Sequence, residues 1–370
     1  MPSLQLSNSS SYPRQKPSEI TLAHLIQEAF DGGYSDIHLT VGEIPRFRDR
    51  GEMQITNYPE TDKATFTSWL YEILGDEEIE SFQKNLEFDG AVQYDFVRVR
   101  INIFDSLRGN GMVLRLIPLQ IMSIEQLRLP PIIQKICDYQ KGLILITGPT
   151  GSGKSTTMAA MVDYINRTMC KHIITIEDPI EFVHQSRQSL IRQREVGMHT
   201  LKFDNALKAA LRADPDIILL GEMWDKETVN TALKAAQTGH LVMGTLHTNS
   251  AVKTIERILN LYSGEEQEAM RVVLAESLIA IVSQGLCRTA DSKRCAFHDI
   301  LINTDAVKDW VRTGNYDEIE ALMKQSGFDG MITINQSLFS LYQEGRITEE
   351  TALEMSPTPN EMAQFLRGRF

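Results

Sequence analysis

The stretch that most constrains the fold of this 370-residue chain is residues 143–158, LILITGPTGSGKSTTM. Residues 148–155 fit the pattern GxxxxGK[ST], with an apolar strand before them and an amphipathic helix after them, as this pattern requires. The glycines allow successive backbone N–H groups to converge on phosphate, and the start of the helix adds a favourable dipole. The stretch therefore predicts a nucleotide-phosphate loop rather than an ordinary glycine-rich turn.

Residue types within this loop predict separate tasks. Lys154 is expected to reach the β- and γ-phosphate oxygens, and Ser155 to ligate magnesium. ATP and Mg²⁺ are therefore the expected cofactors. The residues expected to hold the nucleotide are Thr150, Gly151, Ser152, Gly153, Lys154, Ser155 and Thr156.

The pattern of strands and helices changes along the chain. From residue 141, short apolar strands such as HIITI, DIILL and HLVMGTL alternate with helical segments, which predicts a RecA-like α/β domain with a parallel sheet. The preceding region mixes alternating strands and helices in a smaller α/β unit, and the last part is helical and polar. The expected divisions are a disordered tail at 1–18, a small domain at 19–118, a linker at 119–130, the RecA-like domain at 131–306 and a helical appendage at 307–370.

Acidic residues follow two of the expected strands. Glu222 comes after DIILLG and is the candidate for polarising the attacking water, because a carboxylate at the carboxyl end of such a strand faces the nucleotide crevice. The aspartate that usually holds magnesium there is missing, since Gly221 precedes Glu222. The cluster of Glu177, Asp178 and Glu181 could supply the missing metal or water contact, with Asp178 as metal ligand. Solvated carboxylates at strand ends are the alternative.

Two histidines flank the strand HLVMGTL. His240 precedes it and His247 follows it, so they lie roughly 20 Å apart if the strand is extended and cannot share a metal. His247 could sense the γ-phosphate, and His240 could contact another domain or subunit. A structural role is the alternative for each.

Arg98, Arg100, Arg108 and Arg115 are crowded into the last strands of the small domain. A guanidinium from one domain or subunit can stabilise the phosphate held by another, which would couple hydrolysis to domain placement. Arginines on the solvent face of a sheet are the alternative.

Composition limits the class of partner. No apolar run approaches the ~20 residues of a membrane span, and the N-terminal residues have no apolar core of a secretory signal, so a cytoplasmic protein is expected. The charge balance of 37 basic and 49 acidic residues is the wrong sign for neutralising many nucleic-acid phosphates. The four cysteines form no CxxC pair and are expected to be buried thiols.

These motifs resemble those of a known family. In order and spacing, GPTGSGKSTT, HIITIEDPIEFVH, QREVG, LRADPDIILLGEM and TGHLVMGTLHT are similar to the PilT/PilU group of type IV pilus motor ATPases, within the secretion ATPase superfamily. The resemblance covers nearly the whole chain. SDIHLTVG and RVRINIF resemble the N-terminal domain, and AESLIAIVSQGLCR resembles the helix that follows the nucleotide core.

The resemblance implies a PAS-like N-terminal domain joined to a RecA-like domain in a cytoplasmic homohexamer at the inner face of the membrane. It also implies an acidic Asp box at residues 177–181, a catalytic Walker B glutamate at Glu222 and a His box containing His240 and His247. The implied partners are an inner-membrane pilus platform protein and a paralogous pilus ATPase, with no nucleic acid.

Pilus retraction is the implied function, and alternatives remain. Trp224 stands where the family usually has arginine, and AVKDWVRTGN replaces its AIRNLIRE motif. The C-terminal segments are more similar to PilU, which keeps an accessory motor subunit open. A pilus assembly or secretion ATPase, a nucleic-acid motor and a non-hydrolysing ATP-binding regulator are further alternatives.

Overall fold

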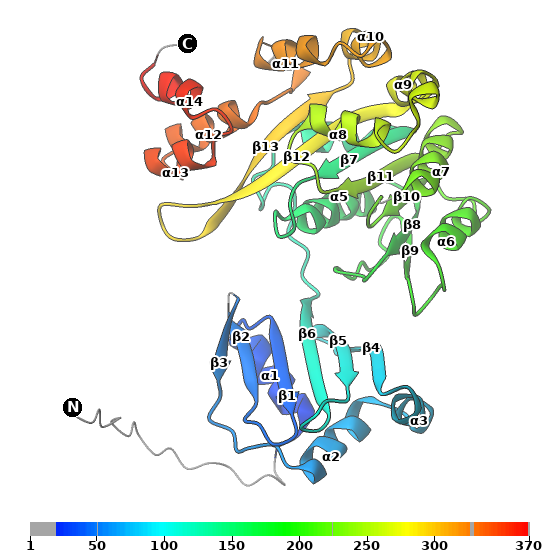
Figure 1. Cartoon of the computed structure of the whole chain (residues 1–370), viewed down its shortest axis with the longest axis vertical. Coiled ribbons are helices and arrows are strands. Elements are labelled where there is room, and N and C mark those ends of the chain that lie inside the picture. Colours follow the sequence, from blue (N-terminus) through cyan, green and yellow to red (C-terminus); the bar gives the residue numbers. More distant parts are fainter. Residues whose placement is uncertain (1–19, 50, 224, 326–328, 369–370) are drawn as a thin grey trace. The chain divides into compact units, whose positions relative to one another are not determined.

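The computed structural model describes residues 20–49, 51–223, 225–325 and 329–368, and within it the chain forms two compact units. The first unit ends at Gln120 and the second begins at Ile121 (Figure 1). The tail expected at 1–18 and the unusual Trp224 lie outside the described residues.

The first unit is one antiparallel sheet with helices. Its strands lie in the order β3-β2-β1-β6-β5-β4. The helices are α1 (Leu22–Asp31), α2 (Lys63–Ile73) and α3 (Asp76–Asn85), and the strands are β1 (Asp36–Thr40), β2 (Arg46–Asp49), β3 (Glu52–Ile55), β4 (Glu87–Gln93), β5 (Val97–Phe104) and β6 (Gly111–Pro118).

Alternation along these strands decides which face is buried. In β5, Val97, Val99, Ile101 and Ile103 are buried and the residues between them are only half-buried. The buried face packs with the helices around Trp69, whose indole N–H donates to the carbonyl of Ile20. Arg98 and Arg100, which alternate with these buried residues, therefore lie on the opposite face of the sheet.

The second unit carries a seven-stranded sheet in the order β13-β12-β7-β11-β10-β8-β9. Its strands are β7 (Gly142–Thr147), β8 (His172–Glu177), β9 (Leu190–Glu195), β10 (Ile217–Leu220), β11 (Leu241–Leu246), β12 (Leu278–Arg288) and β13 (Arg294–Ile302). Its helices are α4 (Ile132–Cys137), α5 (Lys154–Thr168), α6 (Phe203–Ala210), α7 (Lys226–Gln237), α8 (Ala251–Leu259), α9 (Gly264–Ser277), α10 (Asp305–Thr313), α11 (Tyr316–Gln325), α12 (Ile334–Gln343), α13 (Glu349–Met355) and α14 (Pro359–Leu366).

The central strands of this sheet are buried on both faces. Every residue of β7, β10 and β11 is buried, and separate apolar clusters cover the two sides of the sheet. β13 runs antiparallel to β12, whereas the other neighbouring strands that the structure describes in this sheet pair in parallel. The α/β class predicted from the sequence, with a smaller α/β unit before a RecA-like domain, is confirmed, and each unit has its own sheet.

One predicted element is wrong in part. Residues 274–277 end α9, but residues 278–288 form β12, which pairs in parallel with β7 instead of continuing the helix. β-branched and apolar residues at 278–282 give the segment a strand that is buried on both faces, and such a short apolar run cannot be distinguished from a buried helix by periodicity alone.

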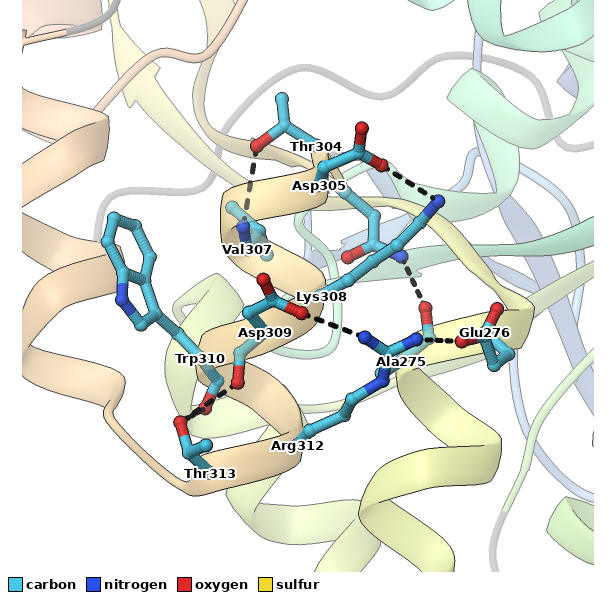
Figure 2. A network of polar contacts seen from close by, with 11 residues as sticks. Ala275, Glu276, Thr304, Asp305, Val307, Lys308, Asp309, Trp310, Arg312 and Thr313 are labelled. Carbon is cyan, nitrogen blue, oxygen red and sulfur yellow. Dashed lines mark hydrogen bonds and ion pairs between the residues drawn. The ribbon is translucent and has the colours of Figure 1, made fainter.

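The C-terminal helices extend this unit, with α10 packed against α9. Figure 2 shows Arg312 of α10 reaching Asp309 on its own helix and Glu276 on α9. Among the described residues, no helix is both long and apolar enough to cross a membrane.

Candidate nucleotide-binding and catalytic site

Four neighbouring parallel strands bring the predicted site residues of the second unit to one edge. β7, β11, β10 and β8 lie side by side, and their carboxyl ends face the same way. The phosphate loop follows β7, His247 follows β11, Glu222 follows β10 and the acidic cluster follows β8. This edge is where open α/β sheets bind ligands.

The phosphate loop turns between β7 and α5 on three glycines with left-handed or otherwise positive φ angles. Gly148 has φ +144°, Gly151 +81° and Gly153 +85°, and Gly153 caps the start of α5. Thr150 and Gly151 are exposed, whereas Ser152 is buried and its hydroxyl has no hydrogen-bond partner in the described part of the chain. Such a loop, with a buried unpaired donor and a helix start, fits an anionic phosphate.

Lys154 begins α5 and folds back over the loop. Its ammonium donates to the carbonyls of Gly148 (2.8 Å) and Pro149 (3.1 Å). Burial lowers the pKa of Lys154, and the negative charges of Glu222 and Glu181 raise it. Ser155 and Thr156 are half-buried in the first turn of the same helix. The lysine therefore lies within electrostatic range of the carboxylates that follow two other strands.

The Glu222 Oε1 and the His247 Nε2 are in direct contact. Burial raises the pKa of Glu222, and His247 and Lys154 oppose that rise. Thr245 on β11 donates to the carbonyl of Gly221, and Met223 N–H donates to the carbonyl of Thr245 (3.0 Å). These bonds fix the Glu222 backbone against β11, so the carboxylate and the imidazole are held together at the sheet edge.

The three residues of the acidic cluster at the end of β8 differ in exposure and in hydrogen bonding. Glu177 accepts from Thr175 (2.6 Å) and Gln193 (3.2 Å), and burial raises its pKa. A Cβ at Gly221, just after β10, would lie 3.1 Å from the Glu177 Cα, so a larger residue there would require the backbone to shift by a few tenths of an ångström. Asp178 and Glu181 are exposed. Glu177 is thus tied into the protein, while the other two carboxylates face outward.

His240 lies away from this edge. It precedes β11, at the strand's amino end, where its ring contacts the carbonyl of Ala235 (3.0 Å). The structure of this unit brings His247 to Glu222 and leaves His240 at the opposite end of the strand.

The four arginines all lie in the first unit. Arg98 and Arg100 are on β5 and Arg115 on β6, and Arg100 is directly opposite Arg115. Arg115 pairs with buried Asp36 (2.9 Å), and the serine and arginine beside Asp36 lower the pKa of that carboxyl against the effect of burial. Arg108 lies outside the strands, mostly exposed, 3.5 Å from Glu43. Three of the four arginines therefore share one open face of the sheet.

Sequence reasoning missed polar residues beneath the phosphate loop. Gln284 on β12 donates to the carbonyl of Ser152 (2.7 Å) and accepts from Thr157 (2.7 Å). Assigning this segment to a helix hid the contact. The signal was present, because Ser283 and Gln284 interrupt an apolar run that ends level with the phosphate loop.

Comparison with known proteins now decides the family. A model of the family described as type II/IV secretion system protein matches residues 13–363. The chain belongs to this family. The resemblance to pilus motor ATPases drawn from the motifs is confirmed.

Several relatives are similar over most of their length. A twitching motility protein of Neisseria gonorrhoeae is 46% identical over 321 residues, 86% of each chain. The type IV pilus retraction ATPase PilT of Pseudomonas aeruginosa is 43% identical, over 88% of this chain and 95% of that protein. The type IV pilus ATPase PilU of the same organism is 37% identical, over 93% of this chain and 90% of that protein.

A solved structure agrees with these relatives. The crystal structure of the pilus retraction motor PilT with bound ADP has a TM-score of 0.86 at 42% identity, covering 94% of this chain and all of that one. The fold of this chain therefore matches that of a motor structure described with bound ADP.

Proposed function

We propose that this chain is an ATP-hydrolysing motor that powers type IV pilus retraction. The observation that carries the proposal is the similarity, over nearly the whole chain, to proteins called a twitching motility protein and a pilus retraction motor. The site supports it independently, because the phosphate loop, Glu222 and His247 meet at one sheet edge. In this proposal the motor acts in the cytoplasm, at the inner face of the membrane beneath the pilus.

Hydrolysis needs a base, a positive charge and an oriented phosphate. The loop N–H groups and Lys154 hold the phosphates, and Glu222 accepts a proton from the attacking water. His247 keeps the Glu222 carboxylate in place and senses the γ-phosphate. Glu177 and Glu181 orient water and add negative charge at the same edge.

The donor set at this edge suits magnesium, which prefers carboxylate and hydroxyl oxygens beside substrate phosphates. Ser155 in the first turn of α5 and the exposed Asp178 would hold the ion. Bound there, Mg²⁺ would neutralise charge on the phosphates.

Work requires the hydrolysis step to move a domain. We assign this role to the first unit, whose Arg98, Arg100, Arg108 and Arg115 include three on one open sheet face. In a homohexamer, arginines of this unit close on bound ATP and are released after hydrolysis, with residues 119–130 as the link between the domains. His240 contacts a neighbouring domain or subunit. Successive closures around the ring withdraw pilin through an inner-membrane platform protein.

A PilU-like accessory motor, acting with a paralogous retraction ATPase, is the second candidate. It is favoured by the match to PilU, which extends over 346 residues, more than the match to PilT. Pilus assembly, nucleic-acid transport and non-hydrolysing regulation are weaker alternatives. The acidic balance of the chain disfavours nucleic acid, and the contact of Glu222 with His247 beside the phosphate loop favours hydrolysis.

The test is a count of surface pili in a strain that lacks this protein, complemented with wild type or with Glu222→Gln. Excess pili corrected only by the wild type are expected. Cells without pili would indicate an assembly motor and contradict retraction. Unchanged pili would contradict autonomous retraction and favour the accessory candidate, which predicts a defect only together with loss of a paralogue.

A further inference from the structure

Strand β12 lies directly beside the phosphate loop. Ser283 pairs with Thr147, the last residue of β7, so Gln284 is level with Gly148, the first residue of the loop. The approach is close, since a Cβ at Gly148 would lie 2.2 Å from the Gln284 carbonyl oxygen. The Gln284 side chain is buried. β12 thus packs directly against the phosphate loop through Gln284.

The Gln284 amide uses both of its ends on the loop and its helix. Its Nε2 donates to the carbonyl of Ser152 (2.7 Å), and its Oε1 accepts from the hydroxyl of Thr157 on α5 (2.7 Å). Gly153 lies between these two residues, and a Cβ there would lie 2.8 Å from the Nε2. A single rigid amide therefore joins the last turn of the loop to the first turn of α5.

Burial makes these bonds hard to replace. A buried carbonyl or hydroxyl without a partner costs far more free energy than one that exchanges its partner for water. The loop contains three glycines with positive φ, and glycine-rich backbone gains much freedom when its contacts are removed. The bond from Gln284 therefore fixes the backbone of the loop at Ser152, immediately before α5.

We infer that Gln284 is a positioning residue that presets the phosphate loop for nucleotide. The inference deepens the proposed ATPase function and rests on it for the identity of the ligand. It concerns nucleotide affinity more than turnover, because Gln284 contacts the loop backbone and not the carboxylates that act on water.

The neighbouring Ser283 begins a series of hydroxyl contacts that leads toward the residues after His247. Its hydroxyl contacts that of Thr147 (2.6 Å), which is within 3.5 Å of the Thr254 hydroxyl. Thr254 in turn contacts Thr248, immediately after His247 (2.6 Å). Gln284 thus contacts the phosphate loop directly, whereas Ser283 is linked to the residue after His247 through Thr147 and Thr254.

The test compares Gln284→Glu with Arg288→Ala in the full chain. Gln284→Glu keeps the acceptor for Thr157 and removes the donor to Ser152, whereas Arg288 is exposed on the same strand. Amide hydrogen exchange of residues 148–157 is measured without nucleotide, and affinity is measured with a fluorescent ADP analogue. We expect exchange about tenfold faster and a Kd about tenfold higher for Gln284→Glu, with kcat at saturating ATP changed less than threefold. Arg288→Ala is expected to match wild type in all three.

Thr157→Val provides a second variant of nearly constant volume, which removes only the bond on the α5 side. We expect it to shift exchange and affinity in the same direction by a smaller factor, and this arm decides the matter if Gln284→Glu does not fold. Unchanged exchange and affinity in folded variants would overturn the inference. A wild type that binds no ADP would instead contradict the proposed function, while the exchange rates would still test the role of Gln284.

Discussion

At the scale of single residues, the decisive group is Glu222. Burial raises the pKa of its carboxyl, which favours proton acceptance, whereas the contact with His247 and the charge of Lys154 oppose that rise. A general base needs a pKa close to the working pH but must stay ionised to act. These two neighbours, which lower the pKa of Glu222, therefore set how far toward acid pH the carboxyl stays ionised.

Replacing His247 with glutamine is expected to move the acid limb of the pH–rate profile to higher pH. With His247 gone, one influence that lowers the pKa of Glu222 is lost, so its carboxyl protonates at a higher pH and activity is lost sooner on acidification. The measurement is kcat/KM for ATP across pH. His240→Gln is the control, because His240 lies at the other end of β11. An unshifted limb in His247→Gln, or an equal shift in both variants, would contradict the role of the contact between His247 and Glu222.

At the scale of elements, Asp299 joins the core to the C-terminal helices. This buried carboxylate on β13 accepts from Ala251 N–H at the start of α8 (2.8 Å) and from the backbone of Ile334 at the start of α12. Burial raises the pKa of Asp299 to about 6, although these bonds and the two helix starts favour the charged form. α8 begins four residues after His247, so the carboxylate also supports the loop that carries the histidine.

Asp299 makes the stability of the protein depend on pH. Because its pKa is raised on folding, its contribution favours the folded state below about pH 4 and is lost as the pH rises to about 6. Between pH 4 and pH 7 the wild type should lose about 2 kcal/mol of unfolding free energy relative to Asp299→Asn, which cannot titrate. Urea unfolding of both proteins from pH 4 to pH 7 measures this difference. Parallel curves would show that Asp299 does not titrate in this range.

The junction of α9 with β12 depends on the half-buried side-chain amide of Asn303. Asn303 donates to the carbonyls of Ala275 (2.8 Å) and Leu278 (2.7 Å), where the helix passes into the strand without a loop. Figure 2 shows the adjacent surface ion pair of Arg312 with Glu276.

Asn303→Ala is expected to lower the unfolding free energy by about 1–3 kcal/mol, because two carbonyls lose their donor. Arg312→Ala should leave the melting temperature close to wild type, since exposed ion pairs are screened by solvent. Thermal unfolding of both variants tests the contrast. Equal effects, or a larger effect of Arg312→Ala, would contradict this view of the junction.

At the scale of the whole molecule, the sequence predicted the α/β class, the strand ends that carry Glu222 and His247, and the family. These predictions follow from local patterns, because a glycine-rich loop or an acidic residue after an apolar strand lies at the same edge of any parallel sheet. The sequence did not predict contacts that depend on which strand is the neighbour. The apolar pattern of residues 278–288 fits a buried helix as well as a buried strand. Gln284 contacts the phosphate loop because this segment is a strand that pairs with β7. The prediction that all four cysteines are buried is wrong for Cys170, which is exposed. The position of Cys287 opposite Cys295 follows from the pairing of β12 with β13, which the sequence pattern did not show.

The proposed ring predicts that an arginine of the first unit acts on bound ATP. Arg100 is the residue we would substitute first, because Arg115 already pairs with Asp36 and Arg108 lies near Glu43. Arg100→Ala should lower kcat about 10-fold or more with little change in ADP affinity, while Arg108→Ala serves as the comparison. Steady-state kinetics on the assembled protein, with its mass checked against six chains of 41.8 kDa, tests this. Full activity of Arg100→Ala would remove that residue from the mechanism.

The central claim is that ATP is hydrolysed at the edge formed by the phosphate loop, Glu222 and His247. It is tested most directly by the steady-state ATP hydrolysis of the purified full chain beside Glu222→Gln, with ADP affinity measured for both. We predict that the glutamine variant binds ADP like the wild type and hydrolyses ATP about 10²–10⁴ times more slowly. A glutamine variant that hydrolyses ATP at the wild-type rate would contradict the claim.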